Sequence, residues 1–245
     1  MTSLDLPPLL VIAGTFAGAV ASGLSGFAFT LIAFSFWLHV LPPTEAVPLS
    51  LSLGLLSQIY TTFRLRRGIR FDLVWPFLIG GVLGVPFGPL LLKLATPAQF
   101  RLGVGILLVC YSSFMLFRPP LRPVRSGGRL ADGAVGALGG LFASAAGLTG
   151  TPPTIWCGLR GWSKEDQRGV YQPFIVIIHT LAMVALGTGI MLDGKVVADF
   201  AVCLPVMVVG TILGLALYGR LDEAQFRRVI LWLLLVSGLL LVASW

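Results

Sequence analysis

Charged side chains are scarce in this sequence: Lys, Arg, Asp and Glu make up 11% of its 245 residues, against about 25% in soluble proteins. So few charges cannot cover a soluble surface, so lipid must solvate most of the protein. Hydrophobic residues make up 56% of the chain, and they recur in runs about as long as a bilayer crossing. The composition excludes a soluble protein and predicts an all-α, multi-pass protein of the cell (inner) membrane.

Chemical groups that other functions require are missing as well. The three cysteines, Cys110, Cys157 and Cys203, show no CxxC spacing, which argues against a disulfide framework or a zinc site. No P-loop motif is present, so ATP does not drive the protein directly. No Asp or Glu lies in the middle of an apolar run, so the usual carboxylates for sodium or proton coupling are missing. We therefore expect no cofactor and no metal ion.

The apolar runs fall into two sets of four. The first set lies in residues 1–120 and the second in residues 121–245, and a connector rich in Pro and Gly separates them. A broken or re-entrant helical hairpin is predicted at 8–40 and at 133–159, and single transmembrane helices at 46–63, 73–92, 102–117, 169–191, 196–218 and 229–244.

The two sets are copies of one unit, because short patterns recur at a nearly constant distance. Ala-Gln-Phe-Arg stands at 98–101 and again at 224–227. Gly-Leu-Ser-Gly at 23–26 recurs as Gly-Leu-Thr-Gly at 147–150, within the first run of each set. We name these two stretches tip 1 and tip 2. The sequence predicts repeat 1 over 1–120 and repeat 2 over 121–245.

The first run of each repeat predicts how the repeats are oriented. A helix over 8–22 would rise only about 22 Å, short of the roughly 30 Å hydrocarbon core, so the run is expected to fold back. With both first runs folded back, 14 of the 17 Lys and Arg residues share one face, whereas full crossings divide them almost equally. The positive-inside rule favours the fold-back. Three full crossings per repeat then invert one repeat relative to the other, with both chain termini on the non-cytoplasmic face.

The tips are the strongest candidate for a functional site. At such a turn the second helix begins with amide groups that have no acceptor in the helix, and two helix starts facing each other can bind an anion. We expect Ser25 and Thr149 to be N-caps, and Pro152 and Pro153 to lie in the first turn of a helix that begins near Thr151. The alternative is that the glycines only permit close helix packing.

Polar side chains near the tips complete the predicted site. Ser22 and Ser144 hold matched positions and could donate to a ligand, or could bond back to their own helices. Gln58 and Gln172 could face the same cavity or bridge helices. The full set of predicted substrate-binding residues is Ser22, Ser25, Gly26, Phe27, Gln58, Ser144, Thr149, Gly150, Thr151, Gln172 and His179.

His179 breaks the repeat. It lies inside an apolar run, where an ionisable side chain is a functional candidate by default. When Pro48 is matched with Pro173, the counterpart of His179 is Gly54. The alternative role is an imidazole satisfied by a neighbouring carbonyl.

The tips, the duplicated halves and the chain length together resemble the TauE/SafE sulfite-exporter family. The matching residues are Gly18, Gly23, Ser25 and Gly26 in repeat 1, and Gly140, Gly147, Thr149 and Gly150 in repeat 2. The resemblance covers nearly the whole chain and implies a transporter, not an enzyme, that exports sulfite, thiosulfate, sulfoacetate or another small, often sulfonated anion. The expected partners are this anion and membrane lipids. The net charge of +7 lies in loop clusters and does not indicate a nucleic-acid partner.

The sequence is also compatible with three different functions. Ser25 within Gly-Leu-Ser-Gly, with His179 as its base, would fit a rhomboid-like intramembrane serine protease. Thr149 at the position that matches Ser25 argues against this, since it suggests a shared backbone role. The second function is that of a structural or assembly subunit, and the third is transport of a different small metabolite.

Overall fold

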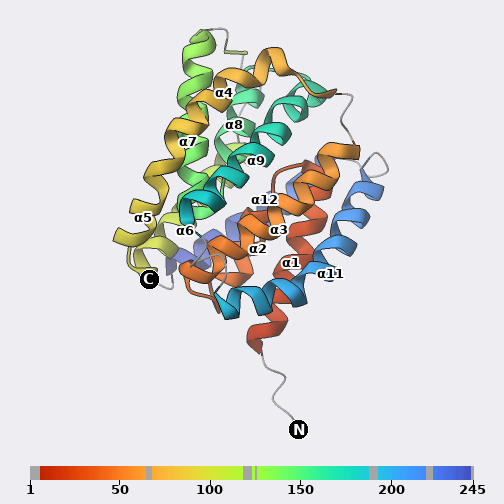
Figure 1. Ribbon diagram of the computed structural model, residues 1–245. Coiled ribbons are helices and arrows are strands. Elements are labelled where there is room, and N and C mark those ends of the chain that lie inside the picture. The colour runs from red at the N-terminus through yellow and green to blue at the C-terminus, as the bar shows by residue number, and fades with distance from the viewer. Residues whose placement is uncertain are drawn as a thin grey trace.

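The computed structural model describes residues 6–64, 68–117, 123–124, 126–187, 193–218 and 223–243, and the regular structure in these ranges is entirely helical (Figure 1). The predicted all-α class is confirmed, and six described helical segments are long and apolar enough to cross a membrane. The elements are α1 (Leu6–Ser25), α2 (Phe29–Trp37), α3 (Pro43–Arg64), α4 (Phe71–Gly84), η2 (Val85–Phe87), α5 (Gly88–Leu94), α6 (Pro97–Phe117), α7 (Gly128–Ala146), α8 (Thr151–Leu159), α9 (Lys164–Leu186), α11 (Gly194–Leu217) and α12 (Glu223–Ala243).

Each predicted hairpin consists of one long helix and one short helix. α1 has 20 residues and α7 has 19, so each rises about 30 Å, whereas α2 and α8 have nine residues each and rise about 14 Å. The expectation of a short first arm over 8–22 is therefore wrong. α1 continues through Gly23 because one glycine weakens a helix by only about 1 kcal/mol. Here Gly23 also packs closely on α11, where an added Cβ would come 2.6 Å from the carbonyl oxygen of Thr211.

Helices of the first half pack on helices of the second half in matched pairs. α1 packs along α11, and α7, the corresponding first helix of the second half, packs along α4. α3 packs against α9, and α6 packs along α12. The two halves therefore interlock (Figure 1). The inverted orientation of the repeats stays a prediction.

Glycines permit the closest of these contacts. A Cβ added to Gly84 would overlap the carbonyl oxygen of Ala137 on α7, and one added to Gly214 would overlap that of Val20 on α1. Small residues that let backbones approach in this way are typical of membrane helix interfaces. At Gly84 and Gly214 the glycines thus serve helix packing.

A tryptophan joins the two arms of each hairpin. Trp37 at the end of α2 donates from Nε1 to the carbonyl oxygen of Val11 on α1, at 2.9 Å, and its side chain is fully buried. Trp156 on α8 donates from Nε1 to Oδ1 of Asp132 on α7, at 2.7 Å, and Arg160 donates to the same oxygen at 2.8 Å. Each short second helix is therefore fixed at its far end to its long partner.

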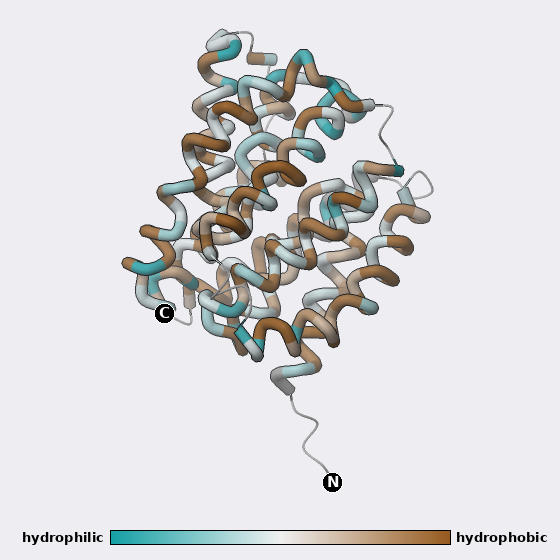
Figure 2. The backbone as a smooth tube through the Cα atoms, viewed as in Figure 1, coloured by the Kyte–Doolittle hydropathy of each residue, from teal (hydrophilic) through white to brown (hydrophobic). Residues whose placement is uncertain are grey.

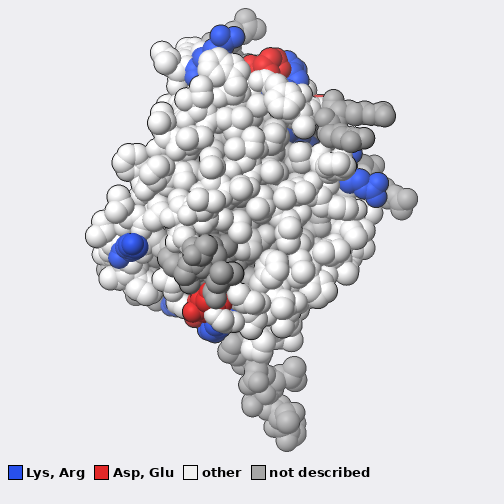
Figure 3. Space-filling model, in the orientation of Figure 1, with Lys and Arg blue, Asp and Glu red and all other residues white. Residues whose placement is uncertain are grey.

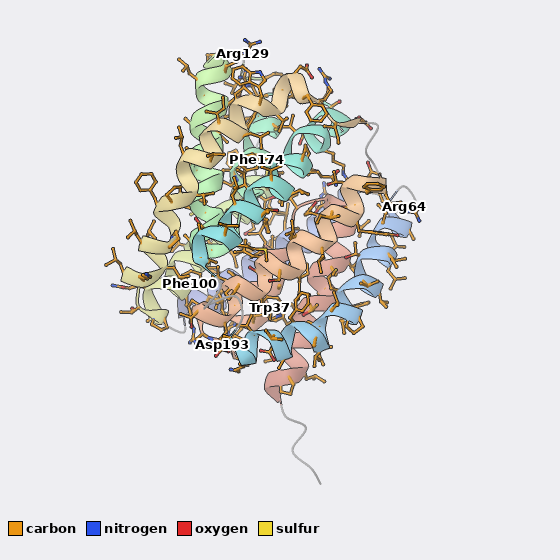
Figure 4. The ribbon with its side chains drawn as sticks, viewed as in Figure 1. Trp37, Arg64, Phe100, Arg129, Phe174 and Asp193 are labelled. Atoms are coloured by element: carbon orange, nitrogen blue, oxygen red, sulfur yellow. The ribbon has the colours of Figure 1, made fainter. Side chains whose placement is uncertain are left out.

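Charged side chains gather at two opposite ends of the molecule. In Figure 3 they lie mainly at the upper and lower ends, and the face between is largely uncharged; Figure 2 shows many hydrophobic residues in the same band. Figure 4 shows Arg129 at the top of the view, Arg64 at its right-hand edge and Asp193 near the bottom. An uncharged band between two charged ends is the surface that a membrane-spanning protein presents to lipid.

Ion pairs link the two halves near both ends. Arg70, six residues after Arg64, contacts Asp166 in the first turn of α9. A hydrogen bond to its second partner, Asp72, raises the pKa of Arg70 further above its ordinary value. Lys195, two residues after Asp193, contacts Glu45 in the first turn of α3, with Nζ 2.6 Å from Oε2. In both pairs a cation at the start of one transmembrane segment meets an acid from the other half.

Candidate functional site

Tip 1 is a turn at the end of α1 whose carbonyl groups are capped by other helices. The chain reverses at Gly26, which has a φ of +85°, a left-handed conformation that favours glycine. The last carbonyls of a helix lack partners within it, so they need donors from elsewhere. Leu24 O accepts from Arg168 Nη2, Ser25 O from the Tyr171 hydroxyl at 2.7 Å, and Gly26 O from Gln58 Nε2 at 2.6 Å.

Tip 2 turns at a different position of the same motif. Gly147, the first residue of Gly-Leu-Thr-Gly, has a φ of +66°, whereas tip 1 turns at the fourth residue. The amides of Gly147 and Leu148 bond to the carbonyls of Ala143 at 2.7 Å and Phe142 at 3.0 Å, and the first of these bonds is that of an αL helix end with glycine in the left-handed position. The two tips are therefore related in sequence but not identical in geometry.

Neither of the two predicted N-cap residues, Ser25 and Thr149, caps the second arm of its hairpin. α2 begins at Phe29 after Ala28, and α8 begins at Thr151 after Gly150; neither start has a side-chain cap. The Ser25 hydroxyl accepts only long bonds from the amides of Phe27 (3.4 Å) and Ala28 (3.3 Å), because α2 starts four residues later. The prediction that α8 begins at Thr151 with prolines in its first turn is confirmed.

Thr149 is turned toward His179 instead of capping α8. Its hydroxyl lies 2.7 Å from Nδ1 of His179, and both residues are buried. The other ring nitrogen, Nε2, faces Gly54 on α3, where an added Cβ would lie 3.2 Å from it. Gly54 and His179 hold matched positions in the two repeats, so the imidazole occupies space that its glycine counterpart leaves open.

A small cavity lies between the two tips at this point. Its lining comes from tip 2, from Phe27 directly after tip 1, from both second arms and from α3 and α9, and it has room for about one water molecule. Tip 2 approaches the residue that follows tip 1 there, because a Cβ added to Gly150 would lie 3.0 Å from Cβ of Phe27. The lining residues are Phe27, Phe29, Leu31, Gly54, Gln58, Gly147, Leu148, Gly150, Thr151, Ile175 and His179.

Five of the predicted site residues line the cavity, and most of the others lie in contact with the tips. Phe27, Gln58, Gly150, Thr151 and His179 are the five. Thr149 holds His179, and the carbonyl of Gly26 holds Gln58. Ser22 accepts long bonds from Ser57 (3.3 Å) and Gln58 (3.4 Å), while Gln172 lies beside Gly26.

Two predicted residues point elsewhere. Ser144 donates to the carbonyl of Val85 at 2.6 Å, so it joins α7 to η2 and does not reach the cavity. Ser25 donates to the carbonyl of Ala21 at 2.8 Å. The structure therefore forms no hydrogen bond between Ser25 and His179, whose Nδ1 is bonded to Thr149, and the protease alternative gains no support.

Two buried charged residues near the tips and the hairpin ends were not predicted from the sequence. Arg168, which directly precedes the apolar run predicted at 169–191, lies inside α9 with 8% of its surface exposed. Asp132, placed just outside an apolar run, lies inside α7 with 6% exposed and is paired with Arg160. Arg168 and Asp132 each lie within two turns of the start of their helix. The polar residues around them in the sequence are typical of a loop, so neither was predicted to lie in a helix.

The cavity offers donors and no acid. Within the described part of the chain, no Asp or Glu lines it. His179 and Gly150 line it: the Gly150 amide has no acceptor among the described residues, and Nε2 of His179 carries a hydrogen in the tautomer whose Nδ1 accepts from Thr149. α8 begins at this point, so the positive end of its dipole also lies there. This arrangement suits a small anion.

Comparison with known protein families gives a match over most of the chain. The family model described as Sulfite exporter TauE/SafE matches residues 10–241, which include both tips and every cavity-lining residue. Comparisons with curated proteins and with solved structures give no significant match.

Proposed function

Because the chain belongs to the sulfite exporter TauE/SafE family, we propose that it exports a small sulfur-containing or sulfonated anion across the cell membrane. The proposed binding site is the cavity between tip 1 and tip 2. The observation that carries this proposal is the meeting of two chain reversals, one from each half, at a cavity that has donors and no acid.

Export requires the cavity to change size. Its present room for about one water is too small for sulfite, so the tips must separate to admit the anion. The ion pairs Arg70–Asp166 and Lys195–Glu45 each join the two halves. In a transporter that opens to one side at a time, we propose that one pair separates while the other persists.

The driving force follows from the lack of a coupling acid at the site. A cell interior is electrically negative, so export of an anion releases about 2.3 kcal/mol per charge at 100 mV. Electrogenic export therefore needs no sodium site and no carboxylate that carries a proton. His179 is proposed to tune anion binding through Nε2, while Thr149 fixes its ring.

Ligand-dependent thermal unfolding of the purified protein tests the proposed site. Sulfite, thiosulfate and sulfoacetate should raise the unfolding temperature, and acetate and uncharged solutes should not; binding at a hundredfold excess over Kd adds about 2.7 kcal/mol. Failure of every sulfur anion to stabilise the protein would contradict the proposal.

Substitutions at the tips locate the binding site. Gly150→Val would place carbon atoms within 3.0 Å of Phe27 and Ile175 and should abolish both stabilisation and transport. Gly103→Val, on α6, is the matched control because nothing lies within 4 Å of its added Cβ, and it should behave as wild type. Ser25→Ala should reduce transport only slightly, because the backbone donors remain. Normal transport by Gly150→Val would place the site elsewhere.

A further inference from the structure

Arg168 is a buried cation that forms no ion pair with any described residue. Only 8% of its surface is exposed, and no described carboxylate lies within ion-pair distance of it. The two acids nearest in sequence do not serve it, since Asp166 pairs with Arg70 and Glu165 is exposed. A buried charge is unfavourable unless other groups compensate for it.

The protein satisfies only part of this guanidinium. Nη2 donates to the carbonyl of Leu24 at the end of α1, and the central carbon lies 3.9 Å from the centroid of the Tyr218 ring. Nη1 is buried, and none of the described residues accepts a hydrogen bond from it. Capping of the C-terminal end of α1 explains the hydrogen bond from Nη2 to Leu24. It does not explain why Nη1 is buried without an acceptor among the described residues.

A second unpaired donor lies one helical turn further along α9. Gln172 is 3% exposed, and its Nε2 also has no partner in the described structure. Residues four apart lie on the same face of a helix, so Gln172 and Arg168 face the same side. An added Cβ on Gly26 would lie 3.1 Å from Nε2 of Gln172, which places this amide at tip 1.

The same face of α9 continues to the cavity. Ile175 and His179, which line the cavity, follow Gln172 at spacings of three and seven residues. Seven residues of helix rise about 10 Å, so Gln172 lies two turns from His179. Arg168 is on the side of the helix start, next to the end of the molecule where Arg70 lies.

We propose that Arg168 and Gln172 form a second binding subsite for the exported oxyanion, occupied between the Arg70 end of the protein and the central cavity. The subsite rests on the transport function proposed above. A guanidinium nitrogen and an amide nitrogen on one face donate to two oxygens of one ligand, which favours sulfite or a sulfonate over a halide. Arg is suited to such a site because its planar fork can hold a backbone carbonyl and an anion at once.

Kinetics and stability together test the subsite. Sulfite and sulfoacetate flux into proteoliposomes would be measured for Gln172→Met and Arg168→Lys, with thermal unfolding of each purified variant. Gln172→Met removes a donor that the protein does not use, so the unfolding temperature should not fall while KM rises about tenfold. Arg168→Lys keeps the charge and loses the fork, and its KM should rise similarly.

Gln167→Met is the matched control on the same helix. Its amide donates to the carbonyl of Trp162 at 2.8 Å, so this variant should unfold at a lower temperature and keep the wild-type KM. A KM within twofold of wild type in both subsite variants would overturn the subsite and leave the transport function intact. A lower maximal rate at unchanged KM in Gln172→Met would also overturn it, because the residue would then only position helices. Absence of flux in the wild type would overturn the transport function and the subsite together.

Discussion

Replacing Gly54 by alanine tests the contact between Gly54 and His179, which hold matched positions in the two halves. The new methyl would lie 3.2 Å from Nε2 of His179 and 3.6 Å from Cδ1 of Phe29, and the first distance is tighter than ordinary contact. The imidazole must therefore shift or rotate, which threatens its 2.7 Å hydrogen bond to Thr149. We expect Gly54→Ala to destabilise the protein and to weaken transport, because it alters the wall of the cavity.

The expected change in the free energy of unfolding combines one stabilising effect with two destabilising ones. Glycine to alanine within a helix gains about 0.5–1 kcal/mol. Overpacking costs about 1–3 kcal/mol, and an interhelical hydrogen bond in a membrane protein is worth about 0.6 kcal/mol on average. Gly103→Ala on α6 has open space around its methyl group, so it should show only the stabilising effect of replacing glycine by alanine within a helix. The two variants should thus differ in free energy of unfolding by about 1.5–3.5 kcal/mol.

Equilibrium unfolding in mixed micelles with increasing SDS, together with sulfite flux in proteoliposomes, measures both effects. Gly54→Ala should unfold at less SDS than Gly103→Ala and transport more slowly. If the two variants are equally stable and both transport as wild type does, the close contact between Gly54 and His179 is not part of the working protein.

The remaining predictions concern topology and the ion pairs. A cysteine at Asp193 should react with an impermeant thiol reagent added to intact cells, and a cysteine at Arg129 should not; the reverse pattern would contradict the predicted orientation. Glu45→Lys should lower the free energy of unfolding by at most about 1 kcal/mol, since the pair with Lys195 is partly exposed, and Glu45→Lys with Lys195→Glu should restore it. No recovery in the double variant would show that the pair is not formed.

Apolar runs predicted the helices well but misplaced several of their ends. The run predicted at 169–191 is α9 at 164–186, and the run at 133–159 begins with α7 at Gly128. Hydropathy marks the part of a helix that lies in hydrocarbon, whereas helices extend into the polar interface through residues that resemble loops. Arg168 and Asp132 were overlooked for this reason.

The sequence predicted where the chain reverses but not how each turn is made. Gly-Leu-Ser-Gly and Gly-Leu-Thr-Gly both mark a tip, yet the left-handed residue is Gly26 in one and Gly147 in the other. The choice depends on tertiary contacts. Gly23 must remain helical to pack on α11, while Gly147 lies against Ser50 of α3. The same limit explains Thr149, whose hydroxyl binds a histidine 30 residues away instead of capping the next helix.

The most direct test of electrogenic anion export is sulfite flux in proteoliposomes under an imposed potassium-diffusion potential, without sodium or a pH gradient. We predict that flux follows the potential and that a monovalent anion is distributed up to roughly fortyfold at 100 mV. Gly150→Val should show no flux, and His179→Ala should still respond to the potential. Flux that ignores the potential and requires a proton gradient, with that requirement lost in His179→Ala, would contradict the account and identify the histidine as the coupling group.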